Sequence, residues 1–171
     1  MTTVDVRTDH LATAAWYAAD PNRWPVAPRF NPVDRWYHRL AQEPDHEVWL
    51  LTWLPGQGTE LHDHGGSAGA FHVVSGILVE DTVMADTLVG AGGVGRRAPV
   101  SRRRPRTASR ELRQGAGRRF GSHHIHRISN RSSRPAVSVH VYGPALSTMT
   151  RYRIGEDGLE PVTVERAGVQ W

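Results

Sequence analysis

The stretch Gly56-Gln57-Gly58-Thr59-Glu60-Leu61-His62-Asp63-His64 decides how this chain is organised. An apolar run, Val48 to Leu54, precedes it and is typical of a buried strand that ends at a Pro-Gly turn. If the segment after the turn is extended, His62 and His64 share one face while Asp63 points away, because side chains alternate along a strand. Two imidazoles side by side on the inner wall of a sheet can begin a metal site. The alternative is two unrelated polar histidines in a loop.

Short strands separated by glycine turns extend on both sides of this stretch. On its N-terminal side, residues 34–42 and 47–54 indicate a hairpin around a Pro-Asp turn. On its C-terminal side we expect Ala70–Val74 to turn at Ser75-Gly76 and to pair with Ile77–Val83. Further strands are expected to start at Leu112 and to span His126–Asn130, Ala136–Tyr142 and Met149–Ile154. This succession predicts an all-β sandwich or barrel.

The length of 171 residues suits a single domain with one hydrophobic core. We expect residues 1–33 to form an N-terminal segment with one or two short helices followed by a Pro-rich loop. Residues 34–154 form the predicted β-barrel core, which contains a Gly- and Arg-rich loop at 90–119 and a turn region at 115–121. Residues 155–171 form a C-terminal tail, either an edge strand or loose chain.

The composition limits the chemistry and the location of the protein. Cysteine is absent, so neither a disulfide nor a thiolate metal site can form within this sequence. No run of about 18 apolar residues occurs, and the N-terminus lacks the apolar core of a signal peptide. We therefore expect a cytoplasmic protein that is neither exported nor attached to a membrane.

Positive charge is concentrated in one segment of the chain. Residues 96–119 hold ten arginines against one acidic residue, Glu111, whereas the rest of the chain carries more acidic than basic side chains. Clustered arginines can neutralise nucleic-acid phosphates, but this segment lacks interleaved aromatic side chains. We therefore expect a solvated, variable loop and no nucleic-acid partner, and we keep a nucleic-acid-binding module as an alternative.

A third metal ligand must come from elsewhere in the chain. Among the ten histidines, His126 has the best context because it begins a predicted strand and is followed by Asn130. His123 and His124 stay open as competing ligands. His72 lies close to the first pair, but we expect it within a strand, in a hydrogen-bonded or exposed setting.

Two spaced patterns resemble the motifs of the cupin superfamily. The first motif is matched by Gly56, His62-x-His64 and Gly76, and the second by Gly115, His126 and Asn130. The resemblance implies a cupin fold, which is a double-stranded β-helix or jelly-roll barrel. Many cupins place an acidic ligand where Gly69 stands here, so the resemblance implies a metal ion held by three neutral imidazoles.

The motifs as a set are similar to those of the cysteine dioxygenase type I family of thiol dioxygenases, over residues 36–154. The matching residues are Tyr37-x-Arg39, Trp53, His62-Asp63-His64, Gly76, His126-Arg127, Asn130, Ser138-Val139-His140-Val141-Tyr142 and Gly143-Pro144. The resemblance implies that His62, His64 and His126 bind Fe(II). It also implies that L-cysteine reacts with O2, which adds both oxygen atoms to sulfur and gives cysteine sulfinic acid.

A row of polar side chains is expected beside the metal. Ser138, His140 and Tyr142 are two residues apart in a predicted strand, so they share one face and can form a hydrogen-bond relay. The resemblance implies that Tyr142 donates to the substrate carboxylate or to oxygen, and that His140 and Ser138 orient its phenol. It further implies that Arg39, with Tyr37, binds the substrate carboxylate.

Two features bear on the type of enzyme and on its substrate. Gly69 stands where mammalian members have a cysteine linked to the tyrosine, as in many bacterial members, so that thioether is excluded. Members that prefer 3-mercaptopropionate tend to have glutamine at the position of Arg39, so Arg39 favours cysteine over such another small thiol. The alternative from a different class is a non-catalytic cupin that binds a ligand or a nucleic acid. The oligomeric state stays open, a monomer included.

Overall fold

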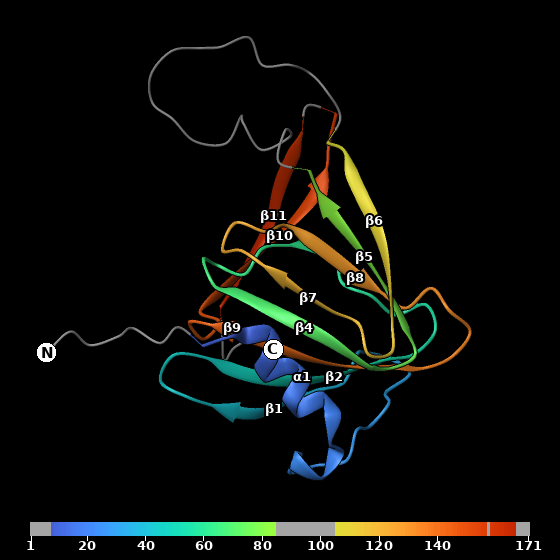
Figure 1. The fold of residues 1–171 in the computed structure, drawn as a ribbon. Helices are drawn as coiled ribbons and strands as arrows, with labels where there is room; N and C mark the ends of the chain where they lie inside the picture. The colour runs from blue at the N-terminus through green and yellow to red at the C-terminus, as the bar shows by residue number, and fades with distance from the viewer. Residues whose placement is uncertain (1–7, 85–104, 157, 167–171) are drawn as a thin grey trace, which may run out of the picture.

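The computed structural model describes residues 8–84, 105–156 and 158–166, and these form two antiparallel β-sheets that face each other (Figure 1). The expected all-β class is confirmed. The five-stranded sheet has the order β1-β2-β9-β4-β7, and the six-stranded sheet has the order β11-β10-β3-β8-β5-β6. The strands are β1 (Tyr37–Gln42), β2 (Glu47–Trp53), β3 (Leu61–His62), β4 (Ala68–Ser75), β5 (Ile77–Val83), β6 (Thr107–Arg113), β7 (Gly117–Phe120), β8 (His126–Ser129), β9 (Ala136–Gly143), β10 (Thr148–Ile154) and β11 (Leu159–Arg166).

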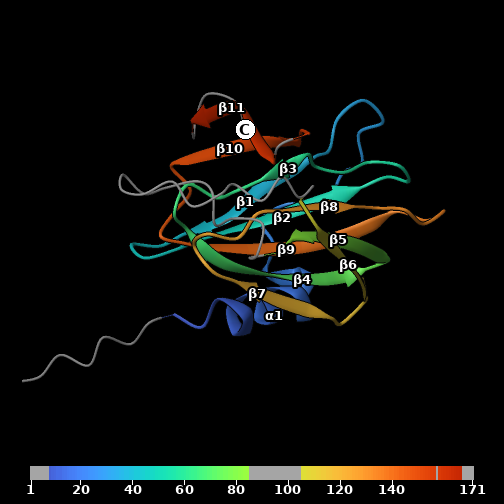
Figure 2. The same ribbon diagram turned by 90° about the horizontal axis from the view of Figure 1, so that it is seen from above.

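One helix, α1 (His10–Ala19), covers the outer face of the five-stranded sheet, and a short 3-10 turn, η1 (Pro21–Arg23), follows it (Figure 2). The Asp9 side chain caps α1 by accepting hydrogen bonds from two backbone N–H groups of the first turn. Its buried Ala14 packs against outward-facing valines and leucines of the sheet. With ten residues α1 is too short to cross a bilayer, and the described residues contain no other helix that could.

The two central strands β2 and β9 separate two apolar layers because their side chains alternate. The valines of β9 pack in the layer under α1, whereas Tyr142 belongs to the core between the sheets. Ser138 and His140 lie on the same inward face, as their hydrogen bonds to each other and to Tyr142 require. On β2, Leu50 packs outward and Trp53 inward. The predicted hairpin of β1 and β2 and the predicted shared face of residues 138, 140 and 142 are both confirmed.

The shortest strand, β3, carries the first histidine of the organising stretch into the middle of the six-stranded sheet. His62 lies opposite Arg151 of β10 on one side and opposite His126 of β8 on the other. Strand pairing therefore places histidines from the two motif regions side by side, although they are far apart in the sequence.

The predicted pairing of Ala70–Val74 with Ile77–Val83 is wrong. Strand β4 pairs with β7 and β9 in one sheet, and β5 pairs with β6 and β8 in the other. The chain crosses between the sheets at Gly76, whose φ is 79°. A Cβ at this position would lie 2.6 Å from the Pro135 carbonyl oxygen, so the close approach of another segment requires glycine here. A Ser-Gly pair between two apolar runs indicates a sharp turn, but it does not say which sheet the next strand joins.

The predicted loop at 90–119 is wrong from residue 107 onward, and residues 85–104 lie outside the described parts. Residues 107–113 form β6, which pairs with β5 along its whole length, and 117–120 form β7. Strand β6 lies at the sheet edge and is almost entirely exposed, so its polar, arginine-rich sequence resembles a loop. The turn predicted at 115–121 is shorter than expected, because β6 ends at Arg113 and β7 already begins at Gly117. In the tail, β11 is an edge strand, which confirms that alternative for 159–166.

Candidate metal centre

Three imidazoles from the two motif regions converge between the sheets. His62 ends β3, His64 follows it, and His126 begins β8. One ring nitrogen of each lies within 4.8 Å of those of the other two, and each pair of ring centroids is 5.0 Å apart. All three side chains are buried. The structure therefore brings together the three residues that the sequence predicts as metal ligands.

The hydrogen bonds of these rings indicate which nitrogen is available to a metal. His62 Nδ1 lies 2.9 Å from the backbone oxygen of Glu60, and His126 Nδ1 lies 2.7 Å from Oε1 of Glu80. A carbonyl or an ionised carboxylate only accepts, so Nδ1 carries the proton and Nε2 is left with a free lone pair. Neither nitrogen of the buried His64 has a hydrogen-bond partner among the described residues. An orphaned buried imidazole beside two others is what a missing metal ion would satisfy.

The electrostatics keep the three rings neutral, as metal binding requires. Burial lowers the pKa of His62 and that of His64 well below the ordinary value, and the charges of neighbouring histidines lower both further. Burial also lowers the pKa of His126, although its hydrogen bond to Glu80 opposes this. Unprotonated imidazoles can bind a divalent cation without first losing a proton.

Asp63 anchors the loop between the two neighbouring histidines. Its Oδ1 accepts hydrogen bonds from the backbone N–H groups of Gly65 and Thr150, both at 3.0 Å. Its Oδ2 accepts from the Tyr152 hydroxyl at 2.7 Å. Because Asp63 is tied to β10 on the side away from the rings, it holds His62 and His64 in place without approaching the metal.

No protein carboxylate can join the three imidazoles from the position that many cupins use. That position is Gly69, where a Cβ would lie 2.2 Å from the Val141 carbonyl oxygen and 2.7 Å from the Phe120 ring. Any larger side chain at position 69 would collide with backbone. The residues present thus fit a metal ion with three neutral nitrogen ligands and positions left for small molecules.

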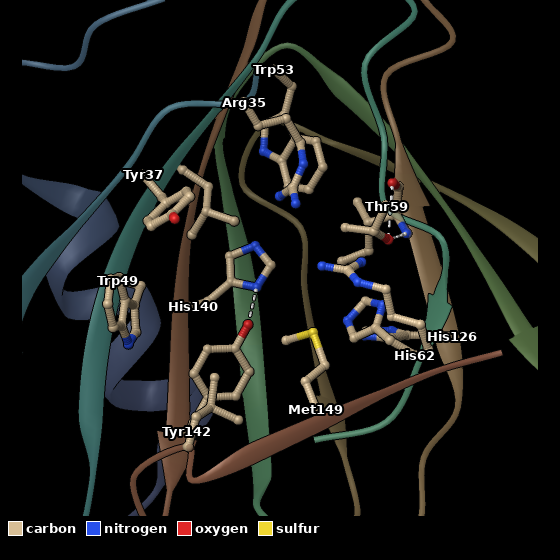
Figure 3. Close-up of a pocket in the computed structure, with 14 residues that line it drawn as sticks. Arg35, Tyr37, Trp49, Trp53, Thr59, His62, His126, His140, Tyr142 and Met149 are labelled. Carbon is tan, nitrogen blue, oxygen red and sulfur yellow. Dashed lines mark hydrogen bonds between the residues drawn. The ribbon is translucent and has the colours of Figure 1, made fainter. Parts of the chain in front are cut away.

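Two of the three imidazoles, His62 and His126, border a cavity of about 80 Å³ between the sheets (Figure 3). Predicted site residues that line it are Tyr37, His62, His126, His140 and Tyr142. Ser138 lies behind them: Trp53 Nε1–H donates to Ser138 Oγ at 2.9 Å, and Ser138 Oγ lies 2.9 Å from His140 Nε2. His140 Nδ1 lies 3.2 Å from the Tyr142 hydroxyl oxygen.

This row of hydrogen bonds has one direction that satisfies every group in it. Trp53 can only donate, so Ser138 accepts from it. Because His140 Nε2 is the acceptor within reach of the Ser138 hydroxyl among the described residues, Ser138 satisfies its own proton by donating to that nitrogen. The proton of neutral His140 then lies on Nδ1 and is donated to the Tyr142 oxygen, which leaves the phenol proton free for the cavity. Burial lowers the pKa of His140 to about 3 and raises the pKa of Tyr142, so both stay uncharged at neutral pH.

Arg39, which the sequence predicts to bind the substrate carboxylate, is not among the described residues that line this cavity. Its side chain is 47% exposed, with Nη1 3.9 Å from Glu47 Oε2. Arg35 lines the cavity instead, its guanidinium carbon 4.9 Å from the centre of the Trp53 ring (Figure 3). Tyr37 and Arg39 are two residues apart in β1, whereas Arg35 lies before this strand begins, so strand alternation does not predict that Arg35 reaches the cavity.

The other candidate histidines stand outside the three-ring cluster. His123 is exposed, and His72 lies on β4 beside Gly117. His124 Nε2 lies 3.0 Å from Glu80, which with His126 makes a second group of closely spaced polar atoms. No motif in the sequence pointed to Glu80. The signal for it was a charged residue directly after the apolar run Ile77-Leu78-Val79 within one strand.

The chain is similar to known proteins in sequence and in fold. The family model described as Cysteine dioxygenase type I matches residues 2–154. None of the curated proteins matches this sequence. Among solved structures, the TT1209 protein from Thermus thermophilus is 21% identical with a TM-score of 0.54, and the match covers 74% of this chain and 95% of that one.

Two further solved structures are similar. An uncharacterized conserved protein with a double-stranded beta-helix domain from Klebsiella pneumoniae subsp. pneumoniae MGH 78578 is 16% identical, with a TM-score of 0.51 and a match over 81% of this chain and 90% of that one. An oxalate oxidase is 12% identical, with a TM-score of 0.51 and a match over 83% of this chain and 63% of that one. These likenesses confirm the expected double-stranded β-helix, or cupin, fold. With a family match over most of its length, the chain belongs to the cysteine dioxygenase type I family.

Proposed function

We propose that this protein is an Fe(II)-dependent thiol dioxygenase whose substrate is a small thiol with a carboxylate, with L-cysteine as the first candidate. The reaction adds one O2 to one thiol, so the sulfur is oxidised to a sulfinic acid and both oxygen atoms are retained. The observation that carries the proposal is the cluster of three buried, neutral imidazoles, two of which, His62 and His126, line a small cavity together with Arg35 and Tyr142.

His62, His64 and His126 would hold the iron. Three neutral ligands leave the full 2+ charge of the ion, which favours an anionic thiolate over a neutral thiol. When bound, Fe(II) would supply the redox chemistry with O2 that side chains alone cannot provide.

Arg35 would bind the substrate carboxylate. Its guanidinium lies over the Trp53 indole, which the hydrogen bond to Ser138 fixes in turn. The described residues that line the cavity include no aspartate or glutamate, so no side-chain anion there competes for this guanidinium. A planar guanidinium forms two parallel hydrogen bonds with a carboxylate and so orients the substrate as well as holding it.

Tyr142 would donate its phenol proton to the substrate carboxylate or to oxygen. The Ser138–His140 row holds the phenol oxygen as an acceptor on one side and leaves its proton for the cavity on the other. A fixed donor of this kind stabilises negative charge as it develops during reaction.

The same observations keep 3-mercaptopropionate as a second candidate substrate. Two arginines, Arg35 and Arg151, line the cavity. The described lining residues include no carboxylate that could pair with the ammonium group of a substrate. Both thiols offer a carboxylate to Arg35. They differ in the amine, for which the described lining residues provide no anionic partner.

The deciding experiment is oxygen consumption by iron-reconstituted protein with L-cysteine, 3-mercaptopropionate and cysteamine, together with metal analysis. We expect one iron per chain, uptake of one O2 per thiol, and a sulfinate that carries two labels from 18O2. The highest kcat/KM identifies the substrate between the two acids. Iron binding without oxidation of any of the three thiols would exclude the proposed activity.

A further inference from the structure

A buried carboxylate lies directly behind one of the three imidazoles. Glu80 is completely buried on β5, and its Oε1 lies 2.7 Å from His126 Nδ1 and 3.0 Å from His124 Nε2. Its Oε2 forms an ion pair with Arg118 Nε at 2.5 Å. Three groups that donate or carry positive charge therefore converge on one carboxylate, and one of them is a predicted metal ligand.

This arrangement determines the state of the His126 ring. The carboxylate can only accept, so it holds the proton on Nδ1 and directs the Nε2 lone pair toward His62 and His64. The other two rings are held differently: His62 bonds to a backbone carbonyl, and His64 has no hydrogen-bond partner in the described parts of the chain. Among the described residues, Glu80 is thus the charged side chain that forms a hydrogen bond with one of the three ligand rings.

We propose that Glu80 is a positioning residue for the metal, fixing the tautomer and orientation of His126 and supplying a negative charge that occupies no coordination position. Arg118 holds the carboxylate from the far side. A carboxylate hydrogen-bonded to a ligating imidazole raises the basicity of that ligand. The inference rests on the metal site of the proposed function and is independent of which thiol reacts.

Packing alone does not explain a glutamate at this position. Burying a carboxylate and a guanidinium costs free energy, and an apolar pair of similar volume is often as stable or more stable. The next residue, Asp81, supplies a matched comparison: it is also buried and also contacts arginines, Arg127 and Arg131. Among the described residues, Asp81 forms hydrogen bonds with these arginines and with Ser109, not with a histidine. A substitution of Asp81 therefore measures what a buried carboxylate on β5 contributes to stability without contacting a ligand ring.

The tautomer of His126 can be observed in the wild-type apoprotein. Long-range 15N–1H correlation spectra of histidine-labelled protein distinguish a proton on Nδ1 from one on Nε2. We expect His126 as the Nδ1–H form near neutral pH. A proton on Nε2 of His126 would overturn the proposal, and this measurement needs no variant that could fail to fold.

Cobalt binding by the apoprotein tests the effect on the metal. Glu80→Gln keeps the shape but adds an NH2 group among three existing donors, so we expect its Kd for Co(II) to rise by roughly ten- to a hundred-fold. In Asp81→Asn we expect the Kd to stay within about twofold, even where stability falls, because no ligand ring is touched. Equal Co(II) affinity in wild type and Glu80→Gln would refute the proposal. Absence of Co(II) binding by the wild type would instead refute the metal site of the proposed function.

Discussion

Beside the three imidazoles, Trp53, Ser138, His140 and Tyr142 pass hydrogen bonds in one direction along a single row. The last member, Tyr142, therefore presents its phenol proton to the cavity. His140, two residues away in the same strand, sets the direction of that proton. Burial raises the pKa of Tyr142, so this proton stays on the phenol at neutral pH. At the scale of single residues, the chemistry depends on which atoms carry hydrogen.

Removal of the Tyr142 hydroxyl should separate metal binding from turnover. We expect Tyr142→Phe to bind iron as the wild type does and to lose roughly ten- to a thousand-fold in kcat, because it removes a donor that acts on developing charge. His140→Gln should show a smaller loss of the same kind. Sulfinate formed per O2 consumed measures coupling in both variants, and wild-type rates and coupling in Tyr142→Phe would make the row purely structural.

The two arginines near β1 should differ in their effect on substrate use. Arg35→Gln should weaken transition-state binding of L-cysteine by about 1.5–3 kcal/mol, the scale of a charge-assisted hydrogen bond, whereas cysteamine, which lacks a carboxylate, should change little. Arg39→Gln is the matched control, since that side chain is half exposed and outside the cavity. Values of kcat/KM for both thiols test this, and a larger cysteine-specific loss in Arg39→Gln would return the role to Arg39.

At the scale of elements, the position of the site depends on where the chain changes sheets. Strands β4 and β5 are separated by Gly76 alone, yet they belong to opposite sheets. This crossing lets β9 with its polar row face β3 and β8 with their histidines. The segment from Pro135 to Ala136 packs so closely on Gly76 that no side chain fits there.

Gly76→Ala should therefore destabilise the protein more than an ordinary glycine substitution does. Gly76 and Gly115 have nearly equal φ angles of 79° and 83°, but a Cβ at 76 meets atoms at 2.6 and 2.8 Å, whereas one at 115 meets nothing within 4 Å. We expect Gly115→Ala to cost about 1 kcal/mol of unfolding free energy for its backbone conformation alone. Gly76→Ala should lower the free energy of unfolding, measured by urea titration, by a clearly larger amount. Equal losses in the two variants would show that the crossing tolerates a side chain.

At the scale of the whole molecule, burial of neutral histidines links stability to pH. The folded protein keeps His140 unprotonated because burial lowers its pKa from the ordinary 6.5 to about 3, whereas the unfolded chain takes up a proton near 6.5. Burial shifts the pKa of His62 and that of His64 in the same direction. The unfolded state thus binds more protons at acidic pH, so this stability is fully present above about pH 6.5 and declines as pH falls toward 3.

The apoprotein should accordingly lose unfolding free energy between pH 7.5 and 5, by up to about 1.4 kcal/mol per pH unit for each such histidine. Urea unfolding at these two pH values measures the loss. His140→Gln has no titrating ring at that position and should show a smaller difference. A free energy of unfolding that is constant from pH 7.5 to 5 would contradict neutral burial of these rings.

The sequence by itself determined the all-β class, most strand positions and the side chains that share a face within one segment. These follow from local rules: side chains alternate along strands, so His62 and His64 share a face, and Ser138, His140 and Tyr142 share another. Spacing of residues within one strand is a property that a linear sequence displays directly.

Only the tertiary structure decided how strands were paired and which charged groups were buried. The exposed edge strand β6 has no apolar alternation to reveal it, and the sheet that follows Gly76 depends on long-range packing. Arg35 lines the cavity although it lies before β1 begins, whereas Arg39 within β1 is half exposed and outside the cavity lining. Glu80 meets His126 and Arg118 because β5, β7 and β8 converge, and contacts between distant segments are set by the packing of the two sheets together.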